Sequence, residues 1–189
     1  TYPVDESIPP YSGRIRIPST TIINDTEYTV TAIGKSAFKD CDSLLSVSIP
    51  ESVESICDSA FVNCFNLPSV NIPQSVTSIG LSAFRECRSI TVITLPKSVK
   101  DIGFYAFEGC SNLTSITIPE NSQLMGIGMR TFYKCRNLTS VNIPESVVSI
   151  GVSAFQGCSN LISITIPKNV TRIPRYAFSG CTNLTSIII

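Results

Sequence analysis

The chain has 189 residues, of which 43% are hydrophobic and 15% charged, so it holds enough apolar side chains for a substantial core. This composition excludes a disordered chain, and 14 basic residues balance 14 acidic ones, so no overall field favours nucleic acid or anionic lipid. No apolar run approaches the roughly 18 residues of a membrane span, so we expect no membrane insertion. The absence of histidine removes Ser-His-Asp and Cys-His catalysis and the commonest metal ligand.

The first segment of the chain, residues 1–34, is irregular and punctuated by prolines. Residues 15–18 match the strand end of the repeated unit that follows, and residues 28–34 match its second half. Between them, Asn24 and Asp25 are flanked by β-branched residues and predict a hairpin turn. We therefore expect residues 1–34 to form an N-terminal cap on a degenerate repeat, since an end repeat must cover the open core.

From residue 35 to residue 189 a unit of 23 residues recurs about seven times, with the last copy truncated. Phenylalanine recurs at 38, 61, 84, 107, 132, 155 and 178, and cysteine at 41, 64, 87, 110, 135, 158 and 181. A fixed period of this size indicates a solenoid, because one unit cannot bury its apolar residues alone but a stack of units can. We expect one solenoid domain.

Each unit predicts a turn and two short extended segments. In the first regular copy, residues 36–41 predict one helical or 3₁₀ turn with Ser36 as its cap, and residues 44–49 predict a strand with one buried face, ended by Pro50. Equivalent first strands are expected at 69–72, 92–95, 115–118, 140–143, 163–166 and 186–189. The second segments are expected at 76–79, 99–102, 124–127, 147–150 and 170–173.

One copy and one cysteine depart from the pattern. The copy after Pro119 is two residues longer, and we expect a bulge there, with Leu124 and Ile127 still in their core positions. Seven cysteines follow the repeat, which favours buried free thiols, although neighbouring coils also lie within disulfide reach. Cys57 stands where most copies have glycine, and we expect it to be partly exposed. No C-x-x-C pair gives zinc-site spacing, and we expect no metal or cofactor.

The pattern L-x-x-[VI]-x-[IL]-P-x-x-V-x-x-I-G-x-x-A-F-x-x-C, repeated over about 35–189, resembles the BspA-like, Treponema-type leucine-rich repeats. The resemblance implies a β-rich, right-handed, curved solenoid with the first strands in a parallel concave sheet and short strands on the convex side. Members of that family are mostly surface or secreted proteins of host-associated bacteria and some parasitic protists. Several are similar to adhesins, so the resemblance implies an extracellular or cell-surface location and a host or cell-surface protein or glycan as partner.

The outward positions of the predicted concave strands are almost all hydroxyl or amide side chains without charge. This face is either a recognition surface for a polar protein or glycan, or a solvated strand face on which serine and threonine are simply acceptable. The candidate residues are Ser69, Asn71, Val92, Thr94, Ser115, Thr117, Ser140, Asn142, Ser163 and Thr165.

A second candidate site is a basic flank in the turns around the phenylalanines and cysteines. Its residues fit an anion or glycosaminoglycan site, or a solvated rim, and Glu86 and Glu108 dilute the positive charge. The candidates are Arg85, Arg88, Arg130, Lys134 and Arg136, with Arg85 and Lys134 taken as near-equivalent positions.

No catalytic constellation emerges, and we predict a non-enzymatic binding module of a surface or secreted adhesin-like protein. The alternative is a structural spacer or self-assembly element without a heterologous ligand. The sequence stops at residues 187–189, inside a predicted strand, which invites pairing with another chain through an uncapped coil.

Overall fold

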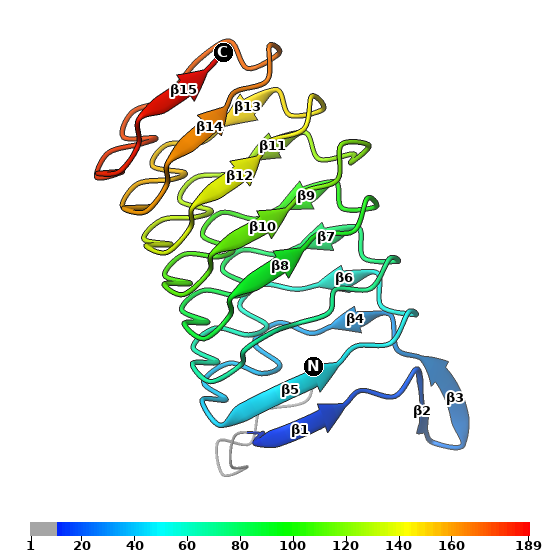
Figure 1. The fold of residues 1–189 in the computed structure, drawn as a ribbon. Helices are drawn as coiled ribbons and strands as arrows, with labels where there is room; N and C mark the ends of the chain where they lie inside the picture. Colours follow the sequence, from blue (N-terminus) through cyan, green and yellow to red (C-terminus); the bar gives the residue numbers. More distant parts are fainter. Residues whose placement is uncertain (1–10) are drawn as a thin grey trace.

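The computed structural model describes residues 11–189, so residues 1–10 of the predicted N-terminal cap lie outside the described residues. The chain winds into a stack of coils, and all strand pairs between coils are parallel (Figure 1). Phenylalanines from Phe38 to Phe178 mark successive coils by stacking ring on ring. The predicted β-solenoid is therefore confirmed.

The first strands of the coils form two parallel sheets, of the orders β1-β5 and β15-β14-β12-β10-β8. The predicted strand at 69–72 is wrong, because that stretch is not a strand and separates the two sheets. Pro68 explains the gap, since it lacks the N–H that the equivalent Thr114 donates to the Thr91 carbonyl at 2.8 Å. The first strands are β1 (Gly13–Arg16), β5 (Leu44–Ser48), β8 (Val92–Thr94), β10 (Ser115–Thr117), β12 (Ser140–Asn142), β14 (Ser163–Thr165) and β15 (Ser186–Ile188).

The second strands form their own sheets, β4-β6-β7-β9 and β11-β13. The predicted extended segment at 170–173 is not a strand, because Pro174 lacks the N–H that the equivalent Gly151 donates to the Ile127 carbonyl at 2.7 Å. These strands are β4 (Ala32–Ile33), β6 (Ser55–Ile56), β7 (Ser78–Ile79), β9 (Asp101–Ile102), β11 (Gly126–Ile127) and β13 (Ser149–Ile150).

The long copy interrupts the second-strand row between β9 and β11. Its extra residues project from a turn after Pro119, where Ser122 N–H bonds the Pro119 carbonyl at 2.9 Å and Glu120 is exposed. Leu124 is fully buried and Ile127 is 2% exposed, so both hold their core positions as predicted.

The N-terminal insertion forms the predicted hairpin, in which β2 (Thr20–Ile23) and β3 (Thr26–Thr29) pair antiparallel. Asn24 and Asp25 have φ of 50° and 60°, as the tight turn between two twisted strands requires. At the same end of the stack, the Tyr11 ring lies 5.2 Å from the Phe38 ring and continues the phenylalanine ladder.

The segments around the phenylalanines are runs of turns, and residues 11–189 contain no helix. The predicted helical turn with a Ser36 cap is therefore wrong. Ser36 and Asp40 have φ of 56° and 60°, and a helix cannot continue through residues in the left-handed region. The same two positions are left-handed in the other coils, at 59, 63, 82, 86, 105, 109, 130, 134, 153, 157, 176 and 180.

The core is a set of ladders that run along the stack. Successive phenylalanine rings stack with centroids 5.1 Å apart at one end, between Phe38 and Phe61, and 5.6 Å apart at the other. Within residues 11–189 all eight cysteines are free, and all but the partly exposed Cys57 are buried. Each thiol from Cys64 onward in the ladder donates to a phenylalanine carbonyl of the preceding coil, as Cys87 does to Phe61 at 3.0 Å. These thiols are therefore buried in the structural role that the repeat predicts.

The glycine of the I-G pair is required by the close approach of neighbouring coils. A Cβ built on Gly103 would lie 2.4 Å from the Leu81 nitrogen, and one on Gly151 would lie 2.4 Å from the Met129 nitrogen. At the first coil, a Cβ on Gly34 would meet nothing within 4 Å. The glycine therefore sets the coil spacing on the second-strand side, where its N–H donates to an isoleucine carbonyl of the preceding coil, as Gly103 does to Ile79 at 2.7 Å.

Candidate functional site

The first strands align their outward side chains in straight rows across successive coils. Ser115 lies opposite Val92 on one side and Ser140 on the other, and Thr117 lies opposite Thr94. The rows continue through Ser163 and Thr165 to Ser186 and Ile188. The alternate residues of these strands, such as Ile116, are in the core. We call the surface built by the outward residues of the first strands the first-strand face.

The hydroxyls of this face differ in how they are used. At the strand entry, Thr114 and Thr139 donate to the threonine carbonyl of the preceding coil, at 2.9 and 3.1 Å. Within residues 11–189, the hydroxyls of Ser115, Thr117 and Ser140 make no such internal bond. They are therefore free to bond an outside partner or water.

Two predicted members of the face lie outside its strands. Ser69 and Asn71 are exposed but belong to the stretch that Pro68 keeps out of the sheet. The sheet of β8 to β15 therefore carries the other eight candidates: Val92, Thr94, Ser115, Thr117, Ser140, Asn142, Ser163 and Thr165.

Three charged residues on or beside this face were missed by the sequence reasoning. Arg14 and Arg16 pair with Ser46 and Ser48 and are exposed, so they extend the outward rows at the N-terminal end. Matching the sequence R-I-R-I-P to S-V-S-I-P in the next copy would have found them. Glu120, from the bulge of the long copy, accepts a hydrogen bond from the side-chain amide of Asn142, and no pattern in the sequence indicates that contact.

The predicted basic flank is divided by its own carboxylates and aromatic rings. Arg85 pairs with the buried Glu108 at 3.2 Å, and Arg88 pairs with Glu86 at 2.9 Å. Arg130 and Lys134 lie over the Tyr133 ring, at 4.8 and 5.1 Å from its centroid. Lys134 occupies the position equivalent to Glu86, directly before the cysteine, so its equivalence with Arg85 is wrong.

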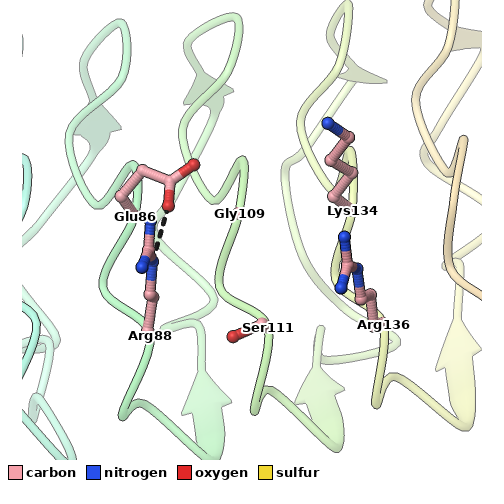
Figure 2. A pocket seen from close by; sticks show the side chains of 6 residues that line it. All are labelled: Glu86, Arg88, Gly109, Ser111, Lys134 and Arg136. Carbon is pink, nitrogen blue, oxygen red and sulfur yellow. Dashed lines mark hydrogen bonds and ion pairs between the residues drawn. The ribbon is translucent and has the colours of Figure 1, made fainter.

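Three of the five basic residues line one shallow cleft of about 340 Å³ (Figure 2). Figure 2 shows Arg88 with Glu86 on one side and Lys134 with Arg136 on the other, and Gly109 and Ser111 on the coil between them. The three cations less the one carboxylate leave two positive charges, which suits a small anionic group. Arg85 and Arg130 do not line this cleft.

Among residues 11–189, no three His, Cys, Asp or Glu side chains are grouped so that they could hold a metal ion. In the same part of the chain, no helix has the length and apolar character to cross a bilayer.

The repeat pattern and the parallel coils are those of a leucine-rich repeat protein, and a comparison with known families identifies which one. The sequence profile of the BspA-type leucine-rich repeat region matches residues 31–126 and 121–189, in six copies. The chain belongs to the BspA-type leucine-rich repeat family. A comparison with curated proteins finds no match.

Solved structures of other leucine-rich repeat proteins resemble this chain. The leucine-rich repeat protein of T. pallidum is 35% identical, with a TM-score of 0.70 over 78% of this chain and 64% of that one. A leucine-rich cell surface protein from Faecalibacterium prausnitzii is 26% identical, with a TM-score of 0.60 over 93% of this chain and 59% of that one. A leucine-rich repeat protein from Bacteroides ovatus is 25% identical, with a TM-score of 0.56 over 99% and 68%. The chain thus spans less than two thirds of the length of the first two.

Proposed function

We propose that this BspA-type repeat chain is a non-enzymatic binding module of a surface or secreted adhesin-like protein. It engages a host or cell-surface protein or glycan through the first-strand face. The observation that carries the proposal is the alignment of uncharged hydroxyl side chains in rows over β8 to β15. Within residues 11–189, the hydroxyls of Ser115, Thr117 and Ser140 in these rows make no internal hydrogen bond.

The parallel strands give this face its capacity to bind. Neighbouring strands lie about 4.7–4.9 Å apart, so the hydroxyls form a fixed lattice of donors and acceptors. Serine and threonine lose little conformational entropy on binding, because their side chains are short and the strands already hold them. Val92 and Ile188, 46% and 55% exposed, add apolar contacts at the two ends of the sheet.

The surface location is supported by a relative. The F. prausnitzii protein with the same fold is described as a cell surface protein, and it covers 93% of this chain. The basic cleft beside Arg136 is a second contact for a ligand that carries anionic groups, such as a sulfated glycan.

The test measures binding of the purified chain to immobilised basement-membrane extract and to a glycan array. Unmodified chain will bind at least one probe saturably, and Thr117→Arg with Ser140→Arg will abolish that binding, because each arginine covers the neighbouring hydroxyls. The matched control is Thr21→Arg, an exposed threonine in the N-terminal hairpin strand β2, outside the first-strand face. No saturable binding to either probe, or equal binding by the double variant, would overturn the proposal.

The alternative function is self-assembly through the last coil. It is favoured by the exposure of Ile187 and Ile188 in the outer strand β15, at 45% and 55%. If that edge pairs two chains, Ile187→Lys will halve the mass measured in solution. An unchanged mass in that variant excludes this edge as the contact.

A further inference from the structure

A stripe of exposed apolar side chains crosses the second-strand side of the stack. Leu81, Phe104 and Val152 stand at equivalent positions directly after the I-G pair and are 43%, 51% and 43% exposed. Met125 and Val148 flank them directly before the second strands β11 and β13 and are 57% and 45% exposed. We call these five residues, with Met129 between Phe104 and Val152, the apolar stripe. An exposed apolar surface of this kind marks an interaction site when polar residues rim it.

The stripe is continuous because its coils are direct neighbours. The carbonyls of Phe104, Met129 and Val152 accept the N–H groups of Ser82, Tyr105 and Arg130, at 2.9, 3.0 and 3.1 Å. The Phe104 ring reaches over Gly128 of the next coil, where a Cβ would lie 2.8 Å from a ring carbon. The aromatic ring therefore lies at the centre of a surface that spans four coils.

Two clefts border the stripe. One, of about 380 Å³, is lined by Val148 and Val152 together with Arg172 and Arg175. The other, of about 210 Å³, lies beside Phe104 where the long copy separates β9 from β11. These hollows offer space for side chains that project from a facing surface.

The two ends of the stripe carry opposite charges. Glu54 and Asp58 lie in the coil before Leu81, and Arg172 and Arg175 lie in the coil after Val152. All four are exposed, and within residues 11–189 none of them makes an ion pair. The row at this position begins with the exposed Lys35 in the first coil. From the next coil onward it reads acidic, four apolar positions, basic: Asp58, Leu81, Phe104, Met129, Val152 and Arg175.

We propose that the apolar stripe joins two copies of this chain in an antiparallel, two-fold symmetric dimer. A two-fold axis parallel to the strands reverses the order of the coils and keeps each row opposite itself. Phe104 then faces Met129 of the partner subunit, Leu81 faces Val152 of the partner subunit, and Asp58 faces Arg175 of the partner subunit. The row from Asp58 to Arg175 is complementary to its own reverse, which is why a second copy fits it, and Lys35 lies beyond the paired part. A parallel arrangement would instead place Asp58 against the same carboxylate of the other copy.

The dimer adds to the proposed function without depending on it. The stripe involves no residue of the first-strand face, so pairing leaves both first-strand faces of the dimer open. Two linked binding faces gain avidity on a surface that carries many copies of one ligand.

The test is the mass of the full chain by sedimentation equilibrium over a wide range of concentration. Unmodified chain will show a monomer–dimer equilibrium, and Phe104→Glu will weaken it by at least about a hundredfold, because two carboxylates would be buried at the dimer axis. The control is Ile162→Glu, which replaces a side chain 53% exposed outside the stripe and leaves the dimer intact. A monomeric unmodified chain, or a Phe104→Glu variant that pairs normally, would overturn the proposal.

A charge exchange tests the antiparallel register. Asp58→Arg alone and Arg175→Glu alone will each weaken pairing by about tenfold or more, because each creates like charges across the interface. The double variant again places opposite charges across the interface, now with arginine at position 58 and glutamate at position 175, and will dimerise. Asp58 also accepts the Leu81 N–H at 2.8 Å, so thermal unfolding confirms that each variant is folded. A folded double variant that stays monomeric contradicts the register.

Discussion

The two strand faces of this solenoid share one core but differ in how they vary along the stack. On the first-strand face nearly every outward position is a small hydroxyl or amide, so successive coils present the same chemistry. Among the second strands the position after the I-G pair passes from Asp58 through Leu81 and Phe104 to Arg175. A row of similar polar side chains, as on the first-strand face, suits a broad contact in which a ligand can bind at several alignments along the stack. A row whose charge changes from negative to positive, as on the second-strand side, suits one partner in one alignment.

Alkaline pH should destabilise the folded chain and with it both strand faces, because both are built on the core that holds the buried cysteine ladder. Burial raises the pKa of the Cys87 and Cys135 thiols well above their usual value. An unfolded thiol ionises near pH 8.5, so the stability that these neutral thiols contribute is fully present below that pH. It is lost as pH rises toward the folded pKa, at a cost on the order of 2 kcal/mol for each thiol by pH 10. Urea unfolding at pH 8 and pH 10 measures the loss.

The variant Cys87→Ala separates the cysteines from other groups that ionise in this range. Its free energy of unfolding should fall less between pH 8 and pH 10 than that of the unmodified chain, by on the order of 2 kcal/mol. Identical pH dependence in the two proteins contradicts the role given to the thiol.

Two glycines on the second-strand side differ in how closely a neighbouring coil approaches them: Gly103 in the middle of the stack and Gly34 at its start. Gly103→Ala should destabilise the chain by about 1–3 kcal/mol, since its Cβ would lie 2.4 Å from the Leu81 nitrogen. Gly34→Ala is the matched control, because its Cβ meets nothing within 4 Å, and it should change stability by less than about 0.5 kcal/mol. Equal losses in chemical denaturation would show that coil spacing does not require the glycine.

The first-strand face is uncharged in its middle but carries two arginines at its N-terminal end, and whether a ligand contacts them can be tested. Replacing Arg14 and Arg16 with glutamine should slow the association of an anionic ligand by a few-fold and flatten its salt dependence. Lys100→Gln, outside that face, should change neither. Association rates at low and high salt decide this, and an unchanged salt dependence removes the arginines from the site.

The smallest effect concerns Cys57, which replaces the I-G glycine. It is the partly exposed thiol among the eight free cysteines of residues 11–189, so one equivalent should react with a thiol reagent in the folded protein. Cys57→Ser should abolish that reaction and leave unfolding nearly unchanged. Fast reaction of several thiols would show that the ladder opens readily.

The periodic residues predicted the solenoid, its core ladders and the free thiols, because each core residue stacks on its own equivalent. The turns were mistaken for helical ones, since the left-handed backbone at Ser36 and Asp40 is not indicated by serine or aspartate alone. The gaps at 69–72 and 170–173 follow from Pro68 and Pro174, whose missing N–H groups were visible in the sequence.

The sites were harder to predict than the core, because they depend on what varies between copies. Arg14 and Arg16 were missed because the first copy is degenerate. That Glu86 and Glu108 dilute the basic flank was visible in the sequence, but their individual ion pairs with Arg88 and Arg85 depend on side-chain placement. The apolar stripe was hidden because its members, such as Leu81 and Phe104, follow core residues in sequence and look like more core.

The most direct test of the account compares Thr117→Arg and Phe104→Glu in one binding isotherm on immobilised basement-membrane extract. Thr117→Arg should lose saturable binding, because it alters the first-strand face. Phe104→Glu should still saturate, with faster dissociation, because the monomer binds through one face and lacks avidity. Equal loss in both variants, or unchanged binding by Thr117→Arg, would contradict the division of work between the two faces.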